Sequence, residues 1–178
     1  MSEPLTAWER CVEFHGHACP GLAIGVRACE AAKEKLGITF ARDEEVVCIA
    51  ENDACGVDAV QVLTGCSIGK GNLILRNTGK MAFTFFCRAR NSGVRLVFKR
   101  PFAREGVDRE AMQQLILSAQ LAELFDCKEP VHAPPVRARL FASVVCEQCG
   151  ESCAEHTARL QGGKKVCLDC FADYSRGW

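Results

Sequence analysis

Apolar and polar positions alternate along the chain in patterns that predict both helices and strands. Residues 20–37 open with proline, continue through an alanine-rich interior and stop at glycine, as an α-helix does. Residues 45–50 are a short apolar run typical of a buried strand, and apolar positions at helical spacing predict a second helix over 55–63. Close packing is expected on the small-residue face of the first helix, formed by Gly21, Gly25, Ala28 and Ala32.

Three further strands are expected over residues 73–76, 81–88 and 94–98. Asn-Thr-Gly and Asn-Ser-Gly turns separate them, so the pattern predicts an antiparallel meander. A longer helix, capped by Asp108, is expected over residues 108–125. Together these elements predict an α+β fold with a mixed β-sheet flanked by helices.

The chemistry of the chain changes after this helix. Prolines 130, 134 and 135 interrupt regular structure, and the segment that follows them is short and dense in cysteine. We therefore expect a first domain over residues 1–128, a proline-containing linker over 129–143 and a small zinc-ribbon domain over 144–178.

Thirteen cysteines in 178 residues are the outstanding feature of the composition. With 48% apolar and 25% charged residues, the chain has the composition of a globular protein, and no apolar run approaches the length of a membrane span. The first ten residues carry neither the basic region nor the apolar stretch of a secretory signal. A cytoplasmic protein is expected, in which cysteines are metal ligands, reactive thiols or small buried side chains.

The net charge of zero conceals an asymmetry. Residues 1–58 carry five basic against eleven acidic side chains, whereas residues 76–109 carry nine against two. Such opposed charges can steer a partner or an anion, although a solvated sheet face is the simpler interpretation. The global neutrality argues against a nucleic-acid binder.

Four cysteines near the carboxyl end have the spacing of a structural zinc site. They form two Cys-x2-Cys pairs with 17 residues between them, which suits one tetrahedral Zn²⁺ ion. An iron–sulfur cluster or a rubredoxin-type iron centre would use the same ligands. The segment resembles the zinc ribbon of DksA/TraR-type zinc fingers. Its expected ligands are Cys146, Cys149, Cys167 and Cys170, with Cys153 and His156 as bystanders that could substitute.

A second metal site is expected near the amino end. His15, His17 and Cys19 alternate, so in an extended segment all three would project to one side. Cys19 also directly precedes the helix predicted over 20–37, where the helix dipole favours a thiolate. Imidazole and thiolate together could hold a transition metal, Zn²⁺ or another.

The turn after the strand predicted over 45–50 supplies further candidates. Cys55 is the natural additional ligand or paired thiol, and Asp53 or Asp58 could orient an imidazole. The glycine-rich stretch over 65–71 departs from a phosphate-binding loop, with three residues between its glycines where four are needed. Pocket-lining residues expected beside Cys55 are Gly65, Cys66 and Lys70, with Lys70 holding an anionic group.

Blocks over residues 14–27, 52–61 and 64–73, with Gly79 and Lys80, resemble the FmdE family of formylmethanofuran dehydrogenase-associated proteins. The resemblance implies an α+β domain, commonly dimeric, that some members join to a zinc finger. It also implies an association with molybdenum or tungsten formylmethanofuran dehydrogenase, without a defined catalytic role. On the matching positions, His17, Cys19 and Cys55 are expected to meet at a metal, with His15 close by.

Three functional hypotheses follow. The first is an accessory or metal-handling component of a molybdenum or tungsten oxidoreductase system, acting as a homodimer, with the components of that oxidoreductase as partners and without a membrane. The second is an enzyme in its own right, which uses a metal or the Cys19 and Cys55 thiols for hydrolytic or redox chemistry. The third is a ribbon that contacts nucleic acid or a polymerase, which the few local basic residues make weak.

Overall fold

Two helices open the part of the chain that the structure describes, a computed structural model covering residues 4–99 and 106–176. Helix α1 spans Ala7–His15, and α2 spans Pro20–Leu36. The helix predicted from residue 20 is confirmed, with Pro20 in its first turn. Helix α1 is not predicted by the apolar pattern, but Thr6 and Glu9 form a capping box at its start.

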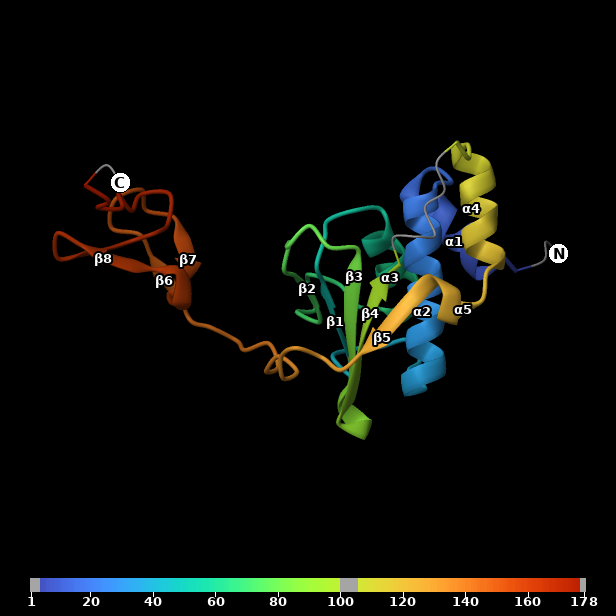
Figure 1. Ribbon diagram of the computed structural model, residues 1–178. Helices are drawn as coiled ribbons and strands as arrows, with labels where there is room; N and C mark the ends of the chain where they lie inside the picture. Colours follow the sequence, from blue (N-terminus) through green and yellow to red (C-terminus); the bar gives the residue numbers. More distant parts are fainter. Residues whose placement is uncertain (1–3, 100–105, 177–178) are drawn as a thin grey trace. The chain divides into compact units, whose positions relative to one another are not determined.

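The described residues of the first unit also contain a five-stranded mixed sheet with the order β2-β1-β3-β4-β5 (Figure 1). This confirms the predicted α+β class. Helix α3, Gly56–Thr64, connects the first two strands, and the short 3₁₀ helix η1, Arg88–Arg90, connects β3 to β4. The strands are β1 Val46–Ala50, β2 Leu73–Leu75, β3 Ala82–Cys87, β4 Ser92–Phe98 and β5 Phe125–Lys128.

The predicted three-strand meander is wrong in its first strand. β2 pairs with β1 in parallel, on the side of β1 away from β3, and only β3 and β4 form an antiparallel hairpin. The physical reason is the helix between β1 and β2. It returns the chain to the start of the sheet, as a parallel connection requires.

The single helix predicted over residues 108–125 is also wrong. Asp108 caps α4, Arg109–Ser118, but Ala119 is extended, and the short α5, Leu121–Leu124, follows. The carbonyl of Ala119 accepts a hydrogen bond from Arg27 Nη2 at 2.6 Å, which holds the interruption against α2. The chain then continues directly into β5, which pairs with β4.

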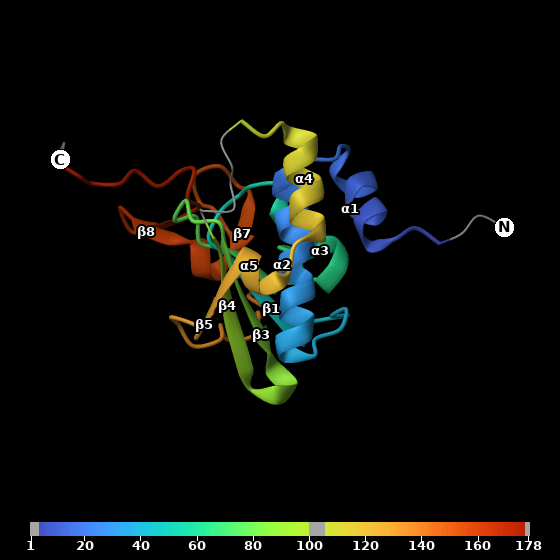
Figure 2. The ribbon, with the colours of Figure 1, turned by 45° about the vertical axis from the view of Figure 1, so that its right-hand side comes forward.

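Helices cover one face of the sheet. Figures 1 and 2 show α2 and α4 lying together against it, and the main hydrophobic core joins them to alternate residues of the strands. Along β1, Val46, Cys48 and Ala50 face this core, whereas Val47 and Ile49 face the opposite side with Phe86. We call this opposite side the outer face.

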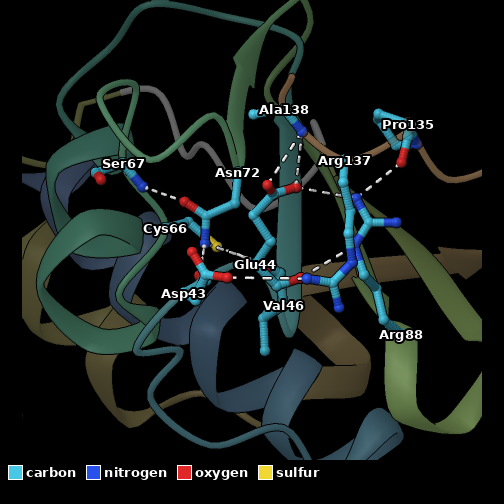
Figure 3. A network of polar contacts seen from close by, with 10 residues as sticks. All are labelled: Asp43, Glu44, Val46, Cys66, Ser67, Asn72, Arg88, Pro135, Arg137 and Ala138. Atoms are coloured by element: carbon cyan, nitrogen blue, oxygen red, sulfur yellow. Dashed lines mark hydrogen bonds and ion pairs between the residues drawn. The ribbon is translucent and has the colours of Figure 1, made fainter. Parts of the chain in front are cut away.

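A segment over residues 135–138 is fastened to the first unit through a buried carboxylate (Figure 3). Glu44 accepts the backbone N–H of Ala138 at 3.0 Å and lies 3.4 Å from Arg88 Nη2. Arg88 also donates to the carbonyl of Pro135 at 2.8 Å. The chain divides into two compact units, Met1–Ala138 and Arg139–Trp178. The boundary between them falls inside the linker predicted over residues 129–143.

No helix among residues 4–99 and 106–176 is both long and apolar enough to cross a membrane.

The second unit consists of two short hairpins and a 3₁₀ turn. The hairpin strands pair antiparallel. The elements are β6 Ser143–Val145, β7 Ser152–Ala154, η3 Glu155–Thr157, β8 Arg159–Gln161 and β9 Lys164–Val166.

Helices α2 and α3 cross at a contact between two glycines. A Cβ atom on Gly25 would lie 2.3 Å from the carbonyl oxygen of Gly56 and 2.5 Å from its Cα. Real Cβ atoms do not approach backbone this closely, and backbone cannot move aside as a flexible side chain can. The small-residue face expected on the first predicted helix therefore sets the spacing of the two helices.

Replacing Gly25 with alanine is expected to destabilise the protein by at least about 2 kcal/mol, because the methyl group forces the two backbones apart. Urea unfolding of the full chain measures this. Gly69→Ala is the control, since no atom lies within 4 Å of the added methyl group, and its effect should stay within about 0.5 kcal/mol. Equal stability of the two variants would contradict the packing argument.

Candidate metal centres

Two groups of side chains among the described residues could hold metal ions. One consists of His15, His17 and Cys19, and the other of the four cysteines in the second unit. Within each group the ligand atoms all lie within 4.8 Å of one another. The first group offers nitrogen and sulfur donors and the second offers sulfur alone, and transition metals favour both kinds of donor.

The first group is built on a turn between two helices. His15 is the last residue of α1, Gly16 adopts a left-handed conformation with φ of 87°, and Cys19 caps α2. The three side chains converge as expected, although His15 belongs to a helix and not to an extended segment. The turn brings its ring to His17, with 4.5 Å between ring centroids.

Asp58 fixes the orientation of His15. Its carboxylate lies 2.7 Å from Nδ1 of the imidazole and also accepts a hydrogen bond from Gln61 at 3.2 Å. The other ring nitrogen, Nε2, lies 4.0 Å from Sγ of Cys19. A carboxylate on the far nitrogen of a ligating histidine sets its tautomer and the orientation of its ring. The arrangement therefore fits a metal between His15 and Cys19.

Cys19 occupies the positive end of α2. Its Sγ accepts the backbone N–H of Leu22 at 3.4 Å, and only 3% of the residue is exposed. This position directs the sulfur atom toward the amino-terminal end of α2, where it accepts a backbone hydrogen bond. His17, by contrast, is exposed. The group thus has one buried sulfur ligand and one solvent-facing imidazole.

Cys55 lies at the edge of this group rather than within it. It packs against Cys19, and a Cβ atom on Gly21 would touch both residues, at 3.4 Å from Cβ of Cys55 and 4.0 Å from Sγ of Cys19. Burial and the neighbouring Cys19 thiol raise the pKa of Cys55. The convergent group does not include it.

The other residues expected around Cys55 lie elsewhere. Asp53 is exposed and has no polar partner among the described residues. Gly65, Cys66 and Lys70 follow the opposite end of α3, where Cys66 is buried against the carbonyl of Val46 and Lys70 donates to the carbonyl of Ala41 at 2.9 Å. The structure therefore does not bring these three residues to Cys55.

An open pocket of about 420 Å³ begins at the ring of His17. Helix α4 forms its other wall with Arg109, Glu110 and Gln113. Gln113 is 7% exposed, and its amide lines the pocket without a hydrogen bond to another described side chain. The sequence gives no direct indication of this wall, because α4 is distant along the chain from His17.

The four-cysteine group lies between the hairpins of the second unit. Cys146 directly follows β6 and Cys167 directly follows β9, so the pairing of each hairpin places one cysteine pair. Backbone N–H groups of Cys149 and Cys167 lower the pKa of Cys146 to about 6. The Cys167 side chain and burial raise the pKa of Cys170 to about 12. A cation is therefore needed to hold all four residues as thiolates.

The two possible substitute ligands have other contacts. Cys153 packs in the small hydrophobic cluster of the second unit, and the ring of His156 stacks on Phe141 with 4.0 Å between centroids. The convergent group does not include either residue. In the first unit, burial raises the pKa of the Cys29 and Cys48 thiols well above the ordinary value, as for small hydrophobic side chains.

Comparisons with known proteins agree with this architecture. Residues 14–131 match the family model described as "FmdE, Molybdenum formylmethanofuran dehydrogenase operon". A crystal structure of a tungsten formylmethanofuran dehydrogenase FmdE-like protein from Syntrophus aciditrophicus superposes with a TM-score of 0.68 at 24% identity. The superposition covers 91% of this chain and 88% of that one, and it shows a shared fold.

A curated relative from Archaeoglobus fulgidus bears the name "Probable S-adenosyl-L-methionine-binding protein". It is 32% identical over 195 residues, which cover 93% of this chain and 52% of the relative. The chain therefore spans about half the length of that protein.

Asp58→Asn is expected to weaken metal binding at the first group by roughly 10- to 100-fold, because the amide is a poorer acceptor for the N–H of His15. Competition with a chromophoric chelator measures the affinity. Asp53→Asn, the same change at an exposed residue without a polar partner, should leave it unaltered. Identical affinities in both variants would argue against a role for Asp58.

Chelation of the second unit's metal is expected to unfold residues 139–178, because four three-residue strands and a small buried cluster cannot stabilise it alone. Amide NMR spectra should lose the dispersed signals of these residues and keep those of the first unit. Because Cys170 has a pKa of about 12, it must lose a proton on binding, so the apparent affinity should rise with pH between 6 and 8. A pH-independent affinity would contradict the four-thiolate site.

Proposed function

Because this chain belongs to the FmdE family, we propose that it binds a transition metal with His15, His17 and Cys19 and serves as an accessory or metal-handling component of a molybdenum or tungsten oxidoreductase system. The observation that carries the proposal is the convergence of these three ligand atoms, with Asp58 holding His15. The metal of the four-cysteine group is Zn²⁺ in this proposal, and its function is structural.

The donor set of the first group favours Zn²⁺ or a neighbouring transition metal over Mg²⁺ or Ca²⁺, which prefer oxygen ligands. Three protein ligands leave a coordination position free, unlike the closed four-cysteine group. A metal bound there would supply Lewis acidity. The solvent-facing imidazole of His17 gives an acceptor or chelator direct access to it, as metal transfer requires.

A metal-dependent enzyme is the second candidate, and the pocket at His17 favours it. Its volume of about 420 Å³ suits a small substrate, and the amide of Gln113 would supply a hydrogen bond to it. Arg109 on the same wall would attract a negatively charged group. In this candidate the side chains of α4 orient the substrate beside the ligand His17.

The metal content of the purified protein tests the proposal. Plasma mass spectrometry of the purified full chain should give two metal equivalents, and His17→Ala combined with Cys19→Ala should leave one. Cys127→Ala is the matched control, since this exposed thiol lies in β5 and outside both groups. Two equivalents in the double variant would overturn the first site.

Transfer kinetics then separate the two candidates. A metal-handling protein should release the metal of the first group to a competing chelator faster than that of the four-cysteine group, because His17 is exposed. An enzyme should keep its metal through many turnovers and should lose activity, but not metal, with Gln113→Leu. Slow release from both groups would contradict metal handling.

A further inference from the structure

A second pocket of the first unit lies on the outer face of the sheet, away from the candidate metal centre. Its volume is about 240 Å³, and its apolar lining consists of Ile49, Phe86 and Val131. In the sheet register Ile49 lies opposite Thr84, and Thr84 lies opposite Arg95, so three neighbouring strands contribute to the same face. Three basic side chains, Arg76, Lys80 and Arg95, line the pocket.

These residues belong to the basic stretch over 76–109, in which several other basic side chains have partners within the fold. Arg88 donates to Glu44 and Pro135, Arg90 to the carbonyl of Leu36, and Lys99 to the carbonyl of Ala122. Among the described residues, no carboxylate forms an ion pair with Arg76 or Lys80. The pocket therefore gathers basic side chains that the fold does not neutralise.

The carboxylate in the pocket is already paired. Glu51 accepts two hydrogen bonds from Arg95, at 2.5 Å from Nε and 2.9 Å from Nη2, and a third from the hydroxyl of Thr78 at 3.3 Å. Its hydrogen bonds with Arg95 keep the pKa of Glu51 below the ordinary value, so it is ionised at neutral pH. With this pair neutral, Arg76 and Lys80 give the pocket a net charge of two positive units.

Neutral donors complete the pocket. Thr84 is 6% exposed and lines the pocket, where its hydroxyl is available as a donor. His132 closes another side, with its Nε2 in contact with Nη1 of Arg76.

We propose that the outer-face pocket binds a tetrahedral oxyanion, either inorganic phosphate or the phosphate group of a small monoester. Two unneutralised cations match a dianion rather than a singly charged carboxylate, and guanidinium, ammonium and hydroxyl donors suit its several oxygens. The pocket volume accommodates one such group with a small substituent. The site uses none of the candidate metal ligands, so it is independent of the proposed function.

Calorimetric titration of the full-length, metal-loaded protein tests this site with inorganic phosphate, glycerol phosphate and acetate as probes. Phosphate or glycerol phosphate should bind, acetate should bind at least about tenfold more weakly, and binding should weaken with added salt. Tighter binding of glycerol phosphate identifies a monoester site, and tighter binding of phosphate identifies a free-anion site. No binding of either phosphate, or equal binding of acetate, would overturn the proposal.

Variants locate the binding. Arg76→Gln and Lys80→Gln change exposed residues and should each reduce phosphate affinity by about tenfold. Arg42→Gln is the matched control, because this exposed arginine precedes β1, at the end of the strand remote from Glu51. His17→Ala should keep full phosphate affinity. An effect of His17→Ala equal to that of Arg76→Gln would assign the anion to the metal centre instead.

Discussion

The crossing of α2 and α3 at Gly25 and Gly56 is the contact on which the candidate metal centre depends. With no side chain on either residue, the two backbones touch, and the amino-terminal ends of both helices come together. Cys19 precedes one helix and Cys55 the other, so their thiols become neighbours. A larger residue at either glycine would separate these ends before it affected any ligand directly.

The same spacing gives Asp58 its position. It lies in the first turn of α3, and from there it reaches His15 at the end of α1. Three helix ends thus meet at one place, and each contributes a different chemical group: an imidazole, a thiol and an orienting carboxylate. Helix packing and metal coordination therefore impose one common geometry on this part of the chain.

Local sequence patterns predict those parts of this arrangement that depend on residues close together in the sequence. The Pro20 start and Gly37 stop of α2, the Asp108 cap of α4 and the two Cys-x2-Cys pairs are all readable within a few positions. Strand order cannot be predicted from such local patterns, because the place of β2 beside β1 depends on how α3 packs. Helix α1 has a readable capping box at Thr6, but the apolar pattern does not indicate that the helix continues to His15.

The fold brings acidic and basic residues from the two oppositely charged regions of the sequence together. Glu44 meets Arg88 and Glu51 meets Arg95, so parts of the acidic first third and of the basic strand region neutralise each other around the sheet. Glu51 directly follows β1 and Asp58 lies in the first turn of α3, yet Glu51 serves the outer face and Asp58 the helical face. The short segment that leads from β1 into α3 therefore supports two sites of opposite character, a cluster of candidate metal ligands on one side and a cationic pocket on the other.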